Sequence, residues 1–117
     1  MKSYRDLIVW QKSMEMVTLT YKALKQFPND EKFGLISQIK RSSISIPSNI
    51  AEGYGRNYTK DYIRFLNIAR GSLYEMQTQL QVALNLNFME EKDLEIIKSL
   101  STEVEKMLNT LIKRLTN

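Results

Sequence analysis

The spacing of apolar residues along the chain predicts four long amphipathic helices. Between residues 6 and 26, apolar positions recur three and four residues apart, as they do along one face of a helix. Ser3 and Asp6 have the spacing of a capping box before this segment, and Pro28 follows it in a turn. The inward face is predicted to carry Leu7, Trp10, Met14, Val17, Tyr21 and Leu24. We therefore interpret the indole of Trp10 as a core side chain rather than as a platform for a base.

A second helix is predicted over residues 32–52, and it breaks several local rules. Pro47 lies inside it and lacks the N–H that would bond the Ser43 carbonyl, so the helix is expected to kink or restart there. Gly53 and Gly55 follow, where a positive φ would favour glycine. Four serines are placed to bond backbone groups freed by the kink: Ser42, Ser43, Ser45 and Ser48. The inward face is predicted to carry Ile36, Ile39, Ser43, Ile46, Ile50 and Gly53.

The third predicted helix has the most regular pattern in the chain. Its apolar positions alternate four and three residues apart, which is typical of the seam of a left-handed bundle. Ile63, Phe65 and Ile68 add apolar surface beside the seam and favour contact with another subunit. Gly71 is interpreted as a site of close helix approach, with Ser72 beside it. The seam is predicted to consist of Tyr62, Leu66, Ala69, Leu73, Met76, Leu80 and Ala83.

A fourth helix is predicted to begin near Glu90, after Asn85 and Asn87 interrupt the pattern. Acidic residues in its first turn and basic residues in its last turn suit the helix dipole. Its apolar positions are Leu94, Ile97, Leu100, Val104, Leu108, Leu111 and Leu115. The predicted fold is all-α, an up-down-up-down antiparallel four-helix bundle whose second helix is kinked at Pro47, with residues 1–117 forming a single domain.

Composition narrows the chemistry that this bundle can perform. The 117 residues include no cysteine and no histidine, which excludes thiol nucleophiles, zinc-thiolate sites and the commonest general base. Di-iron bundles use Glu-x-x-His pairs, which this chain lacks. We therefore expect no catalytic residue, metal or cofactor. The apolar run of residues 7–10 is too short for the apolar region of a signal peptide, and no apolar run in the chain is long enough to cross a bilayer. We therefore expect a cytoplasmic protein without a membrane partner.

All the excess positive charge lies in one third of the chain. Residues 38–70 contain six cations against Glu52 and Asp61, a local net charge of +4, and the remaining residues hold 11 basic and 11 acidic side chains. Such asymmetry attracts polyanions, although a solvated helix face is the ordinary alternative. Pairing of Arg64 and Arg70 with acids across a subunit interface is a second alternative. The predicted nucleic-acid contacts are Lys40, Arg41, Arg56, Lys60, Arg64 and Arg70.

Two catalytic interpretations of the same segment, and one as a phosphate-binding loop, are disfavoured. A serine nucleophile would have only Lys40 as a base, and residues near it suggest that this lysine is exposed. The GYGR sequence at residues 53–56 lacks the preceding strand and the full glycine spacing of a phosphate-binding loop. A metal-dependent nuclease needs several converging carboxylates, and only Glu52 and Asp61 are available in this segment.

Three segments carry a resemblance to a known family. They are QIKRSSISIPSNIAEGYGR at 38–56, RFLNIARGSLYEMQTQL at 64–80 and DLIVWQKSMEM at 6–16. With these segments, essentially the whole chain resembles the bacterial four-helix-bundle proteins encoded in intervening sequences of 23S ribosomal RNA genes. It is more distantly similar to the accessory variability determinant of diversity-generating retroelements. The resemblance implies assembly as a pentameric barrel, and the retroelement relative binds nucleic acid and a reverse transcriptase.

Charge and resemblance together lead to one main hypothesis. The chain is expected to be a non-enzymatic homo-oligomer, a pentamer by resemblance, that associates with RNA or DNA through a basic surface without reading sequence. Five copies of a chain with net charge +4 would together carry +20. The alternative is a scaffold or adaptor that binds a protein partner such as a reverse transcriptase, with the basic segment serving a structural role.

Overall fold

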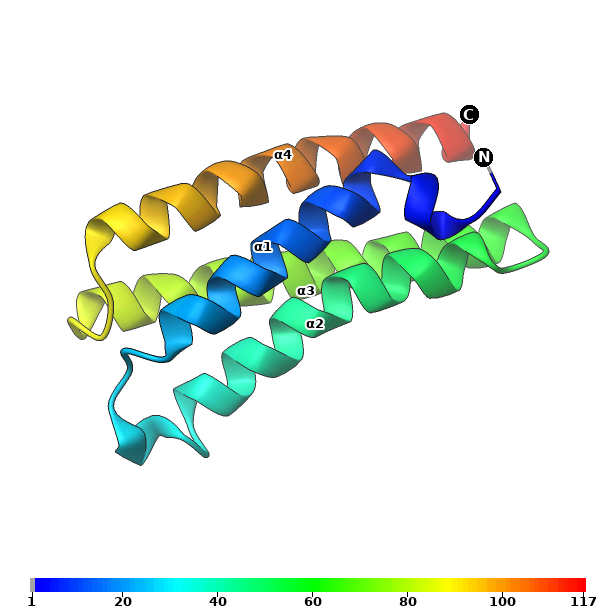
Figure 1. Ribbon diagram of the computed structural model, residues 1–117. Helices are drawn as coiled ribbons and strands as arrows, with labels where there is room; N and C mark the ends of the chain where they lie inside the picture. The colour runs from blue at the N-terminus through cyan, green and yellow to red at the C-terminus, as the bar shows by residue number, and fades with distance from the viewer. Residues whose placement is uncertain (1) are drawn as a thin grey trace.

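The computed structural model describes residues 2–117 and shows four long helices, with no strand in that range (Figure 1). The molecule measures 43 × 25 × 22 Å along its principal axes. Two short 3-10 helices, η1 and η2, precede the first and second long helices. The elements are η1 Tyr4–Asp6, α1 Ile8–Leu24, η2 Asn29–Glu31, α2 Leu35–Tyr54, α3 Thr59–Asn85 and α4 Glu91–Thr116. The predicted all-α four-helix bundle is confirmed.

The helices follow one another around the bundle in chain order. Each packs against the next, and α4 returns to pack against α1, so the diagonal pairs are the more distant ones. Both chain ends lie at the same end of the bundle as the α2–α3 turn, and the other two connections lie at the opposite end (Figure 1). Short connections between successive antiparallel helices produce this up-down-up-down arrangement. The α2–α3 turn is therefore close to both termini.

The core confirms the predicted faces of α3 and α4. Leu66, Leu73 and Met76 are fully buried along α3, and Tyr62 at its beginning is half-buried. Along α4, Leu94 to Leu108 supply the buried positions, while Leu111 and Leu115 are half-buried near the end. Strict periodicity identified these faces because each helix has one continuous apolar stripe.

The predicted inward face of α1 is only partly correct. Val17 and Leu24 are buried, but Met14 is 38% exposed and Tyr21 is half-buried. Leu7 is buried as predicted, and the core also takes residues of α1 that were not predicted: Val9, Ser13, Met16, Thr20 and Ala23. Two polar residues belong to this group because their hydroxyls donate to carbonyls of the same helix, Ser13 to Trp10 at 2.8 Å and Thr20 to Met16 at 2.8 Å. A hydroxyl that is already bonded can be buried at small cost.

Pro47 does not interrupt α2, so the alternative of a restarted helix is wrong. The proline is buried inside a helix that is continuous from Leu35 to Tyr54. Side chains bond carbonyls near the one that Pro47 leaves without its usual partner. Ser48 Oγ donates to the Ile44 carbonyl at 2.8 Å, and Asn49 Nδ2 donates to the Ser45 carbonyl at 2.8 Å. Of the four serines predicted for this role, Ser48 forms such a bond. Ser42 and Ser43 donate to carbonyls one turn before them, and Ser45 pairs with Ser72 on α3.

The glycines serve different purposes from those predicted. Neither Gly53 nor Gly55 has a positive φ, so the expected left-handed helix end is wrong. Gly53 is needed for space instead, because a Cβ atom there would lie 2.7 Å from the Cβ of Phe65 on α3. Gly71 was predicted to allow close helix approach, yet it is exposed and a Cβ would meet no atom of the described chain within 4 Å. Close approach between α2 and α3 therefore occurs at Gly53.

The predicted capping box at the amino terminus is confirmed, but it caps η1 rather than α1. Ser3 Oγ accepts from the Arg5 N–H at 3.1 Å, and Asp6 Oδ2 accepts from the Ser3 N–H at 3.2 Å. The Lys2 N–H also donates to Asp6 Oδ2, at 2.9 Å. These backbone bonds favour the ionised carboxylate and hold the pKa of Asp6 below its ordinary value. The bond from Lys2 contributes most and the bond from Ser3 second.

Candidate nucleic-acid interface

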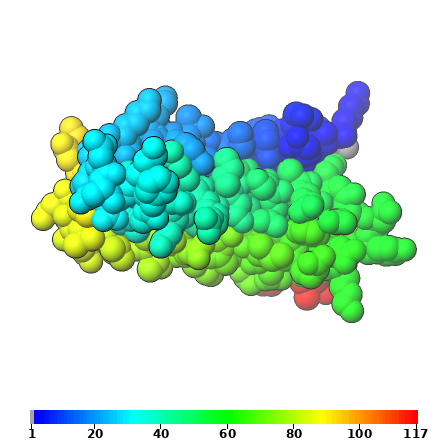
Figure 2. Space-filling model, turned by 90° about the horizontal axis from the view of Figure 1, so that it is seen from below, coloured from blue at the N-terminus to red at the C-terminus, as the bar shows by residue number. Residues whose placement is uncertain are grey.

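The α2–α3 turn brings three of the predicted basic residues to one end of the bundle. Arg56 lies in the turn, Lys60 in the first turn of α3, and Arg64 one helical turn further on. All three side chains are exposed. In Figure 2, the green side chains of this region project from the right-hand end of the molecule. We call Arg56, Lys60 and Arg64 the basic end.

The ring of Phe65 holds the two arginines of the basic end together. The guanidinium carbons of Arg56 and Arg64 each lie 4.7 Å from the centre of this ring. Gly53 leaves the space into which Phe65 packs, since any side chain there would collide with it. Attraction between a cation and an aromatic face contributes about 0.5–1 kcal/mol at exposed sites. The close packing of α2 on α3 thus places two guanidinium groups on one ring.

The charge of the basic end is only partly neutralised by neighbouring acids. Arg56 Nη2 lies 3.4 Å from Glu52 Oε1, one helical turn back on α2. The other ion pairs within residues 2–117 are Lys12–Glu103 and Lys92–Glu90, so Arg64 pairs with no carboxylate of the described chain. An exposed ion pair such as Arg56–Glu52 is weak and can exchange for a stronger anion. Positive charge therefore remains available at the basic end.

Aromatic side chains alternate with these cations in the sequence. Tyr58 lies between Arg56 and Lys60 and is 71% exposed. Tyr54 and Tyr62 pack edge to face, with ring centres 6.1 Å apart. Burial, and secondly the proximity of Tyr54, raise the pKa of Tyr62 above its ordinary value of 10.0. The end of the bundle thus combines cations with one freely accessible aromatic ring.

The other three predicted contacts lie elsewhere. Lys40 is fourteen residues before Tyr54, the last residue of α2, which corresponds to about 21 Å along the helix axis. Its Nζ lies 5.4 Å from the ring centre of Tyr21 on α1. Arg41 is exposed on α2. The half-buried Arg70 donates to Asn109 Oδ1 at 2.8 Å and to Asn67 Oδ1 at 2.7 Å, which links α3 to α4. The six residues do not form a single patch.

Two features of this end were not identified from the sequence. Phe65 was assigned to a subunit contact, whereas it packs within the chain beneath the arginines. Tyr58 was not singled out. The alternation of tyrosine with arginine and lysine over residues 54–64 is the sequence signal that could have indicated Tyr58, because base-stacking surfaces combine aromatic rings with cations.

A metal cluster and a membrane-spanning helix each place requirements on the described residues. Residues 2–117 contain no group of three acidic side chains placed to hold a metal ion. No helix in the same range is long and apolar enough to span a membrane. What the basic end can do chemically is bind anions, since guanidinium groups match phosphate and carboxylate oxygens in a planar, two-point geometry.

Comparison with known proteins identifies the family. A crystal structure of a protein of unknown function from the S23 ribosomal protein family of Bacteroides thetaiotaomicron superposes with a TM-score of 0.80 at 31% identity, covering 91% of this chain and 99% of that chain. No curated protein matches. Neither similarity indicates an enzymatic family. Residues 5–110 match the family described as 23S rRNA-intervening sequence protein, so the chain belongs to that family.

Proposed function

We propose that this chain is a non-enzymatic, homo-oligomeric protein that associates with nucleic acid through the basic end, without reading sequence. The observation that carries the proposal is the pair of guanidinium groups held on the Phe65 ring. Holding two arginines in place before binding lowers the entropy lost when they contact successive phosphates. Lys60 adds a third charge one helical turn from Arg64.

The proposal includes contact with backbone rather than with base edges. No base-reading motif is recognisable in the sequence of the basic end, so its cations are expected to contact phosphates. Tyr58, which is 71% exposed, can stack on any base because every base has an aromatic face. We therefore expect binding to depend on charge and to favour single strands or unpaired ends.

Assembly of several copies is the second part of the proposal. Exposed apolar side chains on α3 support it: Ile68 at 43%, Tyr74 at 41% and Val82 at 42%. A ring of five, as the family resemblance implies, would present the basic end five times. Weak contacts at each copy then combine, because binding at one raises the effective concentration of phosphate at the next.

The test is binding of labelled single-stranded RNA and DNA of mixed sequence, followed by fluorescence anisotropy, with sedimentation velocity to establish the assembly state. We expect binding that weakens steeply between about 50 and about 200 mM salt, because each neutralised phosphate releases counterions. Arg56→Gln combined with Arg64→Gln should weaken binding at low salt by about tenfold or more. It should also reduce the salt slope by about 0.7 for each phosphate that the variant no longer neutralises.

The matched control is Lys92→Gln combined with Lys98→Gln. This pair also removes two positive charges from exposed positions, but in the part of α4 that begins at the opposite end of the bundle. We expect the control to retain most of the binding. Equal loss of affinity in both double variants would show that only net charge matters, and failure of the wild-type protein to bind at low salt would favour the adaptor role instead.

A further inference from the structure

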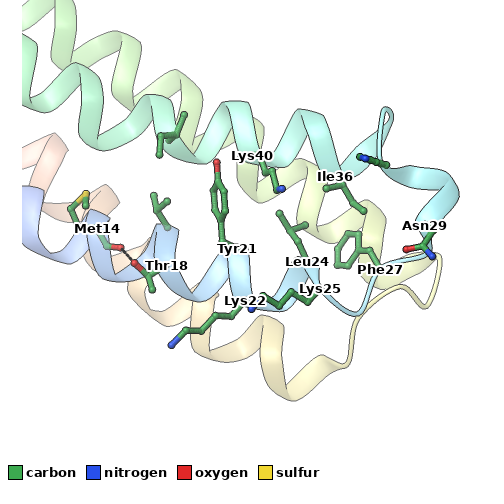
Figure 3. A pocket seen from close by; sticks show the side chains of 13 residues that line it. Met14, Thr18, Tyr21, Lys22, Leu24, Lys25, Phe27, Asn29, Ile36 and Lys40 are labelled. Carbon is green, nitrogen blue, oxygen red and sulfur yellow. Dashed lines mark hydrogen bonds between the residues drawn. The ribbon is translucent and has the colours of Figure 1, made fainter.

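A second surface, distinct from the basic end, lies between α1 and α2. These helices border an open groove of about 910 Å³ that continues along the α1–α2 connection. Figure 3 shows Tyr21 reaching from α1 across to α2 within it. Its apolar lining comes from both helices and from the connection between them: Met14, Val17, Tyr21, Leu24, Phe27, Ile36 and Ile44.

The groove contains the side chains that sequence periodicity assigned to the core. Met14, Val17, Tyr21 and Leu24 belong to the predicted inward face of α1. Val17 and Leu24 are buried as predicted, but Met14 and Tyr21 lie at the edge of the core and border the groove. Met14 therefore remains 38% exposed and Ile44, across the groove, 46% exposed. Phe33, next to the groove residue Lys32, is 90% exposed. A contiguous apolar surface of this kind is typical of an interaction site.

Four lysines surround this apolar surface, and no carboxylate takes part in its lining. Lys22 and Lys25 belong to α1, Lys32 to the connection and Lys40 to α2. Figure 3 shows Lys22 and Lys25 on the α1 side and Lys40 on the α2 side. Within residues 2–117 none of the four forms an ion pair. The groove thus combines an apolar floor with positive charge that the described chain does not neutralise.

We propose that the α1–α2 groove binds an acidic amphipathic helix of a partner protein. The groove follows α1 from Met14 to Lys25, about 17 Å, which matches about three turns of an incoming helix. Its apolar side chains are spaced at helical intervals along α1, so they can receive anchors at positions i, i+3 or i+4, and i+7. Acidic residues flanking those anchors would meet the lysines on both sides, and this charge match selects an acidic helix over a basic one.

The groove between α3 and α4 provides an internal comparison. It has a volume of about 510 Å³ and an apolar lining too, but its charged residues are one lysine and one glutamate, Lys98 and Glu105. It offers no net charge to a partner. A membrane surface or a nucleic acid is less suited to the α1–α2 groove, since Val17 and Leu24 are buried at its floor and a bilayer or a phosphate backbone would contact only the rim.

The test uses a synthetic helix stabilised by a side-chain lactam bridge, with leucines at the anchor positions and glutamates on both flanks. Two control peptides replace every glutamate by lysine or scramble the order of the acidic peptide. Binding is measured by anisotropy, and its location by chemical-shift changes in the backbone amides of the full chain. We expect the acidic helix to bind with shifts confined to α1, the α1–α2 connection and α2, and both controls to bind at least about tenfold more weakly.

Two kinds of variant locate the effect. Ile44→Glu places a negative charge in the groove at an exposed position and should weaken the acidic peptide by about tenfold or more, whereas Ile96→Glu, at a 57% exposed position of α4, should leave binding unchanged. Lys22→Glu combined with Lys25→Glu should shift the preference toward the basic peptide. Circular dichroism would show that each variant remains helical.

Several outcomes would overturn the proposal. Equal binding of the acidic and scrambled peptides would show a charge effect without a helix site. Shifts located on α3 and α4 would place the site elsewhere. Displacement of the acidic peptide by phosphatidylglycerol vesicles would assign the groove to a membrane, and displacement by oligonucleotides would assign it to a nucleic acid. If Ile44→Glu changes the sedimentation of the protein without peptide, the groove binds a second copy of the chain. Arg56→Gln combined with Arg64→Gln should not alter peptide binding, which separates this site from the basic end.

Discussion

Helix α2 has two seams that are built in opposite ways. On its α3 side, small residues allow close contact: Gly53 admits Phe65, and Ser45 Oγ lies 2.9 Å from Ser72 Oγ. On its α1 side, Tyr21 and Ile44 border an open groove. The same helix is thus packed closely against one neighbour and loosely against the other. Residue size at the contact positions accounts for the difference, because interaxial distance follows side-chain volume.

The two seams also hold different cations in different ways. At the close seam, Arg56 and Arg64 lie against one aromatic ring, where delocalised guanidinium groups lose little by partial dehydration. At the open seam, four lysines border the apolar lining, and none of them forms an ion pair within the described chain. Arginines gathered on one ring suit neighbouring phosphates, and lysines spread along a groove suit an acidic helix. The two proposals therefore assign different kinds of ligand to two basic surfaces of one molecule.

Among substitutions that test this difference between the seams, Gly53→Ala is expected to change the free energy of unfolding most. A Cβ at this position would lie 2.7 Å from Phe65 Cβ and 3.3 Å from the Tyr62 carbonyl oxygen, so α2 and α3 must move apart. Overpacking of this kind costs about 1–3 kcal/mol, which exceeds the gain in helix propensity. Denaturant unfolding should show this loss. If Gly53→Ala instead stabilises the protein, the close seam has more freedom than the structure shows.

A smaller effect of opposite sign is expected from Gly71→Ala. Gly71 lies in the same pair of helices, but its Cβ would meet nothing within 4 Å. Alanine should therefore raise the free energy of unfolding by about 0.5–1 kcal/mol through helix propensity and lower entropy of the unfolded chain. Denaturant unfolding should be measured at a protein concentration where sedimentation shows a monomer. Destabilisation there would mean that this face of α3 is packed within the protomer after all.

The smallest effect is expected from the ionisation of Tyr62 at the close seam. Its pKa is raised above 10.0, so the folded state retains the phenolic proton at pH values where the unfolded chain loses it. Stability should therefore decline as pH rises from the ordinary pKa through the raised one. In denaturant titrations, Tyr62→Phe should decline less over that window. Tyr58→Phe, at a 71% exposed position, is the control and should follow the wild-type profile.

The regular helices were the most predictable part of the molecule. For α3 and α4, one apolar stripe per helix left a single way to face the core, and burial follows it from Leu66 to Ala83 and from Leu94 to Leu108. For α1, two stripes lie side by side. Periodicity favoured the more apolar one, whereas the bundle buries Val17 and Leu24 of that stripe together with Ser13 and Thr20 of the other. The hydroxyls of Ser13 and Thr20 donate to carbonyls of their own helix, which offsets the cost of burying them. A hydropathy pattern does not include these bonds.

The sequence identified which basic residues are candidates for the site, but it did not predict how the fold arranges them. Clustering in the sequence suggested one surface from Lys40 to Arg70, yet an exposed side chain can point in any direction around a helix. Folding brings Arg56, Lys60 and Arg64 to one end and directs Lys40 toward the groove with Tyr21. Arg70 becomes a link to Asn109 on α4. Sequence distance is a poor guide here because a helix separates residues by both rise and rotation.

The sequence by itself determined the class of fold, the number of helices and the absence of histidine and cysteine chemistry, because periodicity and composition are local properties of the chain. Only the tertiary structure decided which α1 face is buried, why Gly53 must be glycine and where each cation lies. Those features depend on the distance and rotation between neighbouring helices. Both are set by the volumes of side chains that meet across a seam, and residues far apart in the chain meet there only after folding.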